Sequence, residues 1–255
     1  MKLHHLALPA ACVALAIVTG PAAAVPPLVI GDAPTADRGH LEWYTGVQWQ
    51  RNDAGELSIP TSELVLGVSD WQEVSLEAPF LSIGGERGFG DLVLGTKARL
   101  AREGGSLPGL SASLEWKLPS ASRAAGLGSG ASELELRLRG QRTWAWFTLI
   151  GNAAYALVGE PRVAGRALPR RNTGFLGAGA EAEILEGVAL VADGYWRSAD
   201  VPGEPARAAG DVGVKLRLTH GLALDAAVGR SLRAGAAGGP ELRVYGGLRG
   251  ELGVF

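Results

Sequence analysis

The sequence contains a single cysteine and a single methionine, and charged residues make up only 20% of its 255 positions. One cysteine excludes a disulfide framework and a cysteine-ligated zinc site. The formal net charge of −2 lacks the basic excess of a nucleic-acid-binding surface, so we expect no nucleic-acid partner. The lack of a G-X-Y repeat excludes collagen, and the 47% hydrophobic content excludes a disordered chain. What is abundant is glycine, with 38 residues, about twice the average share.

The first 24 residues have the pattern of a secretory signal peptide. A short basic start, Met1–His5, precedes an apolar run over Leu6–Val18 and the small residues of Pro21–Ala24. The run is shorter than the 20 or so residues of a membrane-spanning helix. An alternative uses Cys12 as a lipid-attachment site, but its apolar core is very short. Cleavage after Ala24 leaves a mature chain without cysteine, which suits an oxidising compartment.

The mature chain alternates with period two and has no apolar run long enough for a membrane helix. The clearest examples are Leu110–Leu118, Glu133–Arg139 and Asp211–Leu218. Alternation of this kind predicts β-strands with one polar and one apolar face. We expect about twelve of them, near 39–51, 55–68, 71–81, 89–101, 109–118, 131–140, 143–157, 173–184, 187–198, 209–219, 221–231 and 240–254.

Short and long connections alternate between the predicted strands. Tight turns are expected at 69–70, 141–142, 185–186 and 220–221, and longer connections at 82–88, 119–130, 158–172, 199–208 and 232–239, with 102–108 and 52–54 as exceptions. Sorting of loop length by end is typical of an outer-membrane barrel with short periplasmic turns and long extracellular loops. We therefore predict an all-β protein, a transmembrane antiparallel up-and-down barrel over 39–255, preceded by a periplasmic segment over 25–38.

Charged side chains gather on one face of the predicted strands. A soluble sandwich would also separate polar from apolar faces, and it stays an alternative. A dozen antiparallel strands, however, must curl or split, and closure into a barrel satisfies every backbone group, as lipid requires. The charged face then lines the lumen, and its candidate residues are Glu42, Glu73, Glu77, Asp91, Lys97, Arg99, Glu115, Lys117, Glu133, Glu135, Arg137, Arg139, Glu181, Glu183, Asp193, Lys215, Arg217, Asp225, Arg243, Arg249 and Glu251.

Aromatic residues lie near the predicted strand ends and suggest two interfacial girdles. The periplasmic set is Trp43, Tyr44, Trp71, Trp144 and Trp146, and the outer set is Trp49, Phe80, Trp116, Tyr155, Tyr195 and Trp196. The chain ends at Phe255, and a terminal aromatic is the mark that the barrel-assembly machinery reads. Phe255 is out of phase with the apolar face of the last strand, and a kink at Gly253 would correct this.

Several stretches resemble a bacterial family of outer-membrane barrels named for the MetA pathway of phenol degradation, whose members often carry the label transporter. They are Pro27–Pro34 with Gly39–His40, Gly88–Arg99, Lys117–Pro119 with Gly126–Gly130, and Val158–Pro161. The family's usual Tyr-Arg-Phe ending is replaced by Gly253–Phe255. The resemblance covers roughly residues 27–255 and implies a barrel and a transport role.

The expected function is passive passage of small organic solutes, aromatic or hydrophobic ones among them, through the lumen of a barrel in the bacterial outer membrane. The expected partners are outer-membrane lipid, the barrel-assembly machinery and the solute. One alternative is a structural or surface-binding barrel with a plugged interior, using loops 119–130 and 158–172. Another is a lipid-modifying enzyme that uses His40 or His220. Neither histidine has a serine or aspartate at a telling spacing, so we expect no catalysis. We also expect no cofactor and no metal, because arginines across the barrel neutralise paired carboxylates such as Glu133 and Glu135.

Overall fold

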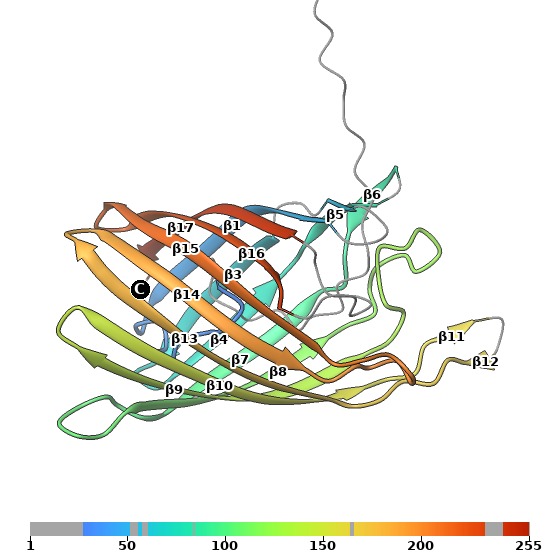
Figure 1. Cartoon of the computed structure of the whole chain (residues 1–255), viewed down its shortest axis with the longest axis horizontal. Helices are drawn as coiled ribbons and strands as arrows, with labels where there is room; N and C mark the ends of the chain where they lie inside the picture. Colours follow the sequence, from blue (N-terminus) through green and yellow to red (C-terminus); the bar gives the residue numbers. More distant parts are fainter. Residues whose placement is uncertain are drawn as a thin grey trace, which may run out of the picture.

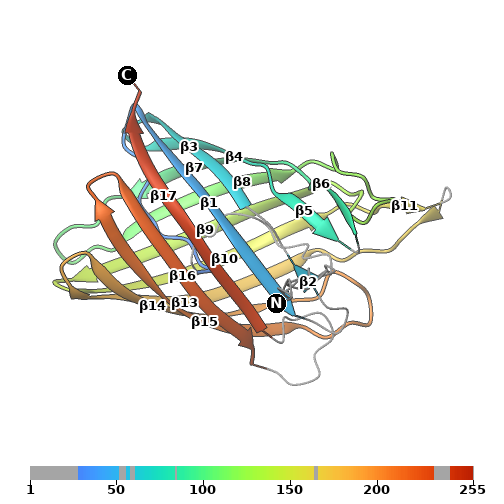
Figure 2. The same cartoon turned by 90° about the horizontal axis from the view of Figure 1, so that it is seen from above.

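The computed structural model describes residues 28–51, 56–57, 61–83, 85–163, 166–232 and 242–254. These residues form twelve long antiparallel strands that close into a barrel (Figure 1). The first and last strands, blue and red in Figure 2, lie side by side and pair from His40–Gly253 to Arg51–Leu242. The barrel predicted from the alternation is therefore confirmed. None of the described residues belongs to a helix long and apolar enough to cross a membrane.

The barrel strands match most of the predicted ranges closely. They are β1 (His40–Arg51), β3 (Thr61–Ser69), β4 (Gln72–Glu77), β7 (Val93–Ala101), β8 (Gly109–Lys117), β9 (Glu133–Trp144), β10 (Phe147–Val158), β13 (Thr173–Leu185), β14 (Val188–Arg197), β15 (Arg207–Thr219), β16 (Leu222–Ser231) and β17 (Leu242–Gly253). Short strands lie outside this set: β2 (Glu56–Leu57) pairs with β1, and two hairpins are made by β5 (Phe80–Ile83) with β6 (Glu86–Phe89) and by β11 (Arg162–Val163) with β12 (Arg166–Ala167).

Strand β9 illustrates how the sequence builds the wall. Its side chains alternate without interruption from Glu133 to Arg139, and the charged ones are buried while the leucines between them are exposed. Arg137 is 2% exposed, whereas its neighbour Leu136 is 52% exposed. A soluble sandwich would bury the leucines and expose the charges. The reverse arrangement, an apolar outer surface around a charged interior, is that of a barrel surrounded by lipid.

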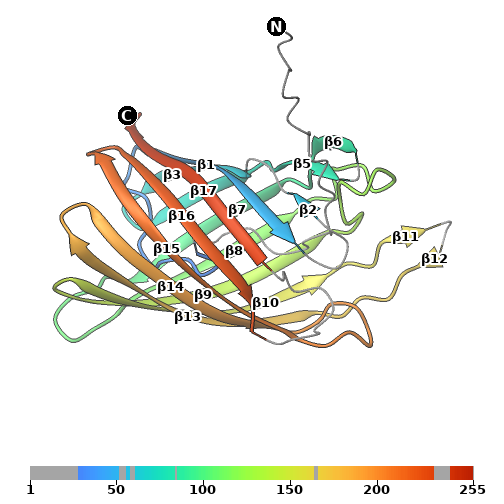
Figure 3. The same ribbon diagram turned by 45° about the horizontal axis from the view of Figure 1, so that its top comes forward.

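The two ends of the barrel differ, and we name them by their connections. The turn end carries the connections 70–71, 102–108, 145–146, 186–187 and 220–221. The loop end carries the connections that follow β1, β4, β8, β10, β14 and β16, and the β5–β6 and β11–β12 hairpins project there (Figure 3). This is the predicted sorting of short and long connections.

One predicted turn is wrong. Residues 141–142 belong to β9, which continues to Trp144, and the turn is formed by Ala145 and Trp146. The polar pair at 141–142 is satisfied without a turn, because the Arg142 guanidinium donates hydrogen bonds to carbonyl oxygens of the neighbouring connection at Leu107 and Gly105. Ala145 takes the left-handed backbone conformation that this tight turn requires, with φ of 44°.

The aromatic residues are divided between two faces of the wall. The outward-facing members of the predicted girdles are exposed, and they include Trp71, Trp144 and Trp146 at the turn end and Trp116, Tyr155 and Trp196 at the loop end. Tyr44 and Tyr195 were predicted in the girdles but face the lumen, because they alternate with the outward Trp43 and Trp196. Phe255 and the predicted signal peptide lie outside the described residues.

Asp91 was predicted to line the lumen, but it lies in the connection between β6 and β7. Its carboxylate accepts hydrogen bonds from the backbone N–H of Ala121 (3.0 Å) and from the N–H and hydroxyl of Ser129 (2.8 and 2.9 Å). Asp91 therefore joins the 118–132 connection to the connection between β6 and β7 by hydrogen bonds. The alternation that identified the other lumen residues does not extend to this position, because the chain here is not a strand.

Replacing Asp91 with alanine should loosen this connection. The substitution leaves three donors without their acceptor, and we expect tryptic cleavage after Arg123 to be about tenfold faster, equivalent to ~1.4 kcal/mol of local opening. Digestion of the folded protein followed by mass spectrometry measures the rate. The control is Glu86→Ala, which removes an exposed carboxylate from the adjacent hairpin. Equal rates for the two variants would contradict the role given to Asp91.

Candidate functional site: the barrel lumen

The strand register places the predicted lumen residues on the inner face, Asp91 excepted. Opposed pairs such as Glu42 with Glu251 and Lys117 with Glu133 share that face. The middle of the wall is tightly enclosed, since Glu115, Glu135 and Arg139 are all buried. At the turn end the same face opens, and Glu183, Arg217 and Glu251 are about half exposed.

A first network of ion pairs crosses strands β8 to β14. Glu135 lies at its centre and pairs with Arg137 at 2.8 Å and with Arg197 at 3.2 Å. The Lys117–Glu133 and Arg139–Glu115 pairs measure 2.7 and 3.3 Å and flank this centre, and both are cross-strand contacts. Buried charges of this kind are tolerated only when they are paired and hydrogen-bonded. The network therefore braces one side of the wall.

A second network spans strands β13 to β17. It consists of Lys215–Glu181 (2.7 Å), Arg243–Asp211 (2.7 Å), Arg249–Asp225 (3.4 Å) and, at the open turn end, Arg217–Glu183 (3.2 Å). Each bond joins side chains on the same inner face. Both charge signs therefore line the lumen in fixed pairs, so the formal charges largely cancel within the wall.

The lumen is not empty. Residues 28–36, which we call the lumen segment, lie inside the ring of strands, where the start of the described chain is drawn in blue (Figure 1). The backbone N–H groups of Val29 and Ile30 donate to the Asp193 carboxylate at 2.8 and 3.1 Å. Gly31 exchanges two hydrogen bonds with the Asn152 amide, at 2.9 and 2.8 Å.

The lumen segment continues toward the turn end, past strand β9 and then to strand β4. The N–H of Ala33 donates to Gln141 at 3.4 Å, and the N–H of Ala36 donates to Glu73 at 2.6 Å. Residues 25–38 were predicted to form a periplasmic segment, whereas the structure places 28–36 in the barrel. The physical reason is that the wall offers side-chain acceptors to these backbone groups, and apolar contacts to Leu28 and Ile30.

Where the chain leaves the lumen it passes close to strand β3. Arg38 forms an isolated bridge with Gly67, and the N–H of Gly39 donates to the Gly67 carbonyl at 2.8 Å. A Cβ atom on Gly67 would lie 2.0 Å from the Asp37 carbonyl oxygen. Glycine is required here because two backbones approach too closely for any side chain.

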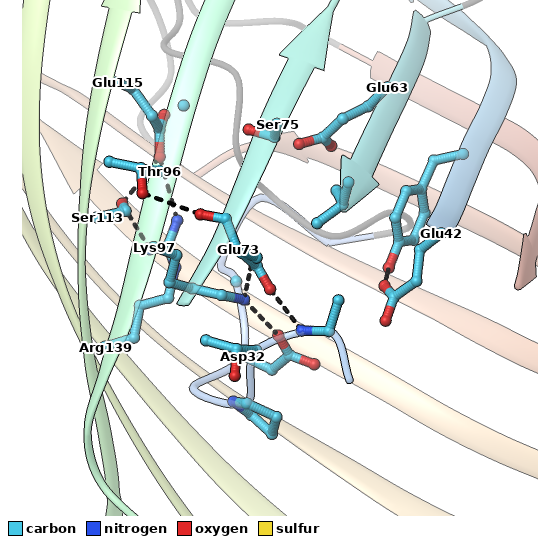
Figure 4. Close-up of a pocket in the computed structure, with 17 residues that line it drawn as sticks. Asp32, Glu42, Glu63, Glu73, Ser75, Thr96, Lys97, Ser113, Glu115 and Arg139 are labelled. Carbon is cyan, nitrogen blue, oxygen red and sulfur yellow. Dashed lines mark hydrogen bonds and ion pairs between the residues drawn. The ribbon is translucent and has the colours of Figure 1, made fainter. Parts of the chain in front are cut away.

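A cavity of about 80 Å³ remains between the lumen segment and strands β1 to β9 (Figure 4). Lys97 bridges the two sides, 3.1 Å from Glu73 and 3.8 Å from Asp32 of the segment. The lining is mainly acidic, since Asp32, Glu42, Glu63, Glu73 and Glu115 outnumber Lys97 and Arg139. A second cavity of about 200 Å³ lies near Ala33, Arg99 and Gln141.

The family profile "Putative MetA-pathway of phenol degradation" matches residues 24–242. The chain belongs to this family. The resemblance inferred from the sequence is therefore confirmed. A search of the curated proteins finds no match.

Solved structures share the fold of this MetA-pathway family member. An outer membrane channel from Pseudomonas putida F1 aligns with a TM-score of 0.72 at 13% identity, covering 88% of this chain and all of that one. The NanC porin aligns at 0.57 with 10% identity, covering 83% of this chain and 100% of its own. The KdgM porin aligns at 0.54 with 9% identity, covering 83% and 98%. At these identities the likeness establishes the outer-membrane barrel fold.

Several lumen residues of this family member escaped the sequence analysis. Glu63 lies in a strand whose alternation shifts phase before it, so its face could not be assigned. Asn152 is a polar residue within an apolar strand, which was a usable signal for an inward position. Arg197 and Asp211 lie on the same faces of their strands as Asp193 and Lys215, so the alternation was a usable signal for both, and both lie in the ion-pair networks.

The two histidines of the enzyme alternative lie at the turn end. His40 begins β1 and its ring contacts the Glu251 carboxylate, and His220 forms the turn between β15 and β16. In the described part of the chain, no group of three or more His, Cys, Asp or Glu side chains is arranged to hold a metal ion.

Proposed function

We propose that this barrel is an outer-membrane channel for passive diffusion of small organic solutes, and that the lumen segment narrows its path. The observation that carries the proposal is the way the segment is held. Its hydrogen bonds to the wall run from single backbone groups to the side chains of Asp193, Asn152, Gln141 and Glu73. Water or solute can replace such hydrogen bonds one at a time, whereas the hydrogen bonds of a paired strand form a continuous ladder.

The fold supports this proposal without naming a solute. The family description refers to phenol degradation, and the structural relatives named above are a channel and two porins. A twelve-stranded barrel is intermediate between the filled eight-stranded and the open sixteen-stranded type. A narrow path for small molecules fits that size.

We further propose that the solutes that pass through the channel include aromatic or hydrophobic molecules. Part of the wall is apolar, with Ile150, Phe175 and Val191 buried against the lumen segment. Apolar surface inside a charged lumen gives a passing solute a favourable contact that a purely polar path lacks.

Liposome swelling tests the proposal. Vesicles containing the refolded mature protein should swell faster than protein-free vesicles in L-phenylalanine and in glutamine, with phenylalanine the faster by about twofold or more, because it contacts the apolar wall. The tetrasaccharide stachyose should be excluded by size. Swelling no faster than protein-free vesicles with every solute would refute a channel.

A plugged structural barrel is the second candidate, and the two ion-pair networks and the lumen segment favour it. It differs in one measurable respect, because a permanent plug permits no solute-dependent swelling even when the fold is intact. Heat-modifiable migration on a gel verifies the fold in the same sample.

A further inference from the structure

Strands β10, β13 and β14 carry an apolar recess in the lumen, beside the networks of charged residues. We call it the wall pocket, and it is formed by Ile150, Phe175, Val191 and Tyr195. The rings of Phe175 and Tyr195 stack with centroids 5.7 Å apart and planes inclined by 24°. An apolar surface of this kind facing water would be unfavourable, so it is expected to hold an apolar occupant.

The lumen segment supplies that occupant. Leu28 and Ile30 are 4% and 2% exposed and pack in the wall pocket. The wall is hollowed beside Ile30, because two glycines of β13 leave it space: a Cβ atom would lie 2.6 Å from the Ile30 side chain at Gly177 and 2.3 Å from it at Gly179. The recess is therefore shaped for a branched or ring-shaped apolar group.

Polar side chains beside the wall pocket accept hydrogen bonds from N–H donors. Asp193 accepts the N–H groups of Val29 and Ile30, and Asn152 accepts one N–H and donates to one carbonyl of Gly31. An apolar recess with a few convergent polar groups is the usual composition of a small-molecule site. The lumen segment fills this site as a ligand would: its apolar side chains occupy the recess, and its backbone N–H groups donate to the adjacent polar side chains.

We propose that the wall pocket with Asp193 and Asn152 is a solute-binding site of the channel, and that the lumen segment is its competing occupant. This rests on the proposed channel function and adds its ligand chemistry. The ligand is a compact aromatic or branched aliphatic molecule bearing an O–H or N–H donor. Binding of the solute displaces Leu28 and Ile30 and thereby widens the path.

The charges near the wall pocket favour a donor over a carboxylate. Asp193 faces Asp211 across the strand pair, and Arg243 is ion-paired with Asp211, so the charge at the receiving end of the site is that of Asp193. The guanidinium groups of Arg137 and Arg197 lie over the Phe175 ring at 4.6 and 5.8 Å, but both are ion-paired with Glu135. A carboxylate would have to compete with Glu135 for them and would be repelled by Asp193.

A thiol reporter on the lumen segment tests the competition. Ala33 is 2% exposed, so Ala33→Cys in the mature chain should react slowly with a soluble maleimide. Benzyl alcohol and benzylamine should accelerate the reaction about fivefold or more, because a ligand that excludes the segment shifts the population toward the displaced form. Benzoate has the same ring but no donor at neutral pH, and it should have little effect.

Two variants in the same background separate a specific site from general partitioning. Asp193→Ala removes the acceptor, and the difference between benzyl alcohol and benzoate should disappear. Val47→Ala removes an apolar side chain from the outer face of β1, where Val47 is 54% exposed, and the difference should persist. Acceleration by benzoate equal to that by benzyl alcohol, or no acceleration by any probe, would overturn the proposal.

Failure of this inference and failure of the channel function are distinguishable. Swelling by phenylalanine without displacement of the reporter would refute the binding site and leave the channel intact. Displacement without swelling in any solute would leave the site as a binding pocket of a barrel that does not conduct.

Discussion

A variant lacking residues 28–36 should have a single-channel conductance about fivefold or more above that of the full mature chain, since a twelve-stranded barrel has room for water once its interior is vacated. The lumen segment now occupies that room and bonds to both sides of the wall, through Asp193 on β14 and Glu73 on β4. Planar-bilayer recording of the two refolded proteins measures the difference.

A length-matched variant separates filling of the lumen from loss of a tether. Replacing 28–36 by glycine and serine keeps the chain length but removes the side chains of Leu28 and Ile30. This variant should show conductance that fluctuates between the low and high levels, because the flexible chain enters and leaves the lumen. Equal, steady conductance in all three proteins would contradict the role of the segment.

Glu135→Ala should be the most destabilising single substitution in the wall, costing about 3–5 kcal/mol of unfolding free energy. Glu135 is 2% exposed and is the common partner of Arg137 and Arg197. Its removal takes the shared carboxylate from two guanidinium groups that lie over the same Phe175 ring. Urea unfolding in lipid vesicles, followed by tryptophan fluorescence, measures the loss.

Two further variants make the Glu135 result interpretable. The double variant Glu135→Ala/Arg137→Met removes one unpaired charge and should recover part of the lost stability. Glu251→Ala removes a carboxylate from the half-exposed turn end and should cost less than ~1 kcal/mol. If the rim variant were as damaging as Glu135→Ala, burial would not be the cause.

The barrel itself was predictable from the sequence because most strands carry their own signal. In Glu133–Arg139 and Asp211–Leu218 every second residue is apolar, and this fixes the face of each side chain without knowledge of its neighbours. The turn at Ala145–Trp146 was missed because the residues taken for the turn, 141–142, are polar. Arg142 instead donates a hydrogen bond to the Leu107 carbonyl of the adjacent 102–108 connection.

The sequence predicted that the charged residues share the inner face of the wall, but it did not predict which of them form ion pairs. Alternation places Glu135, Arg137 and Arg197 toward the lumen once their strands are assigned, but which charges meet depends on strand register. The register follows from closure of the whole barrel, a property of all twelve strands together. Nothing in the sequence around Glu135 therefore indicated that it forms ion pairs with two arginines.

The lumen segment lay beyond sequence reasoning for a different reason. Residues 28–36 have no alternation, and their partners are distant in the chain: Asp193 is 164 residues from Val29, and Asn152 is 121 from Gly31. Nothing local distinguishes a peptide that lies in a lumen from one that lies in the periplasm. The isolated polar Asn152 in an apolar strand was the single available hint.

A cross-link between the lumen segment and the wall tests the central claim most directly. The mature chain is expected to lack cysteine, so Ala33→Cys/Gln141→Cys introduces a single pair of thiols at positions joined by a hydrogen bond. A short bis-maleimide, which adds one thiol at each end, should link them in the folded protein, and the linked channel should remain at its low conductance even with benzyl alcohol present. Failure to link, or linking that leaves solute-dependent opening intact, would contradict a lumen segment that restricts the path.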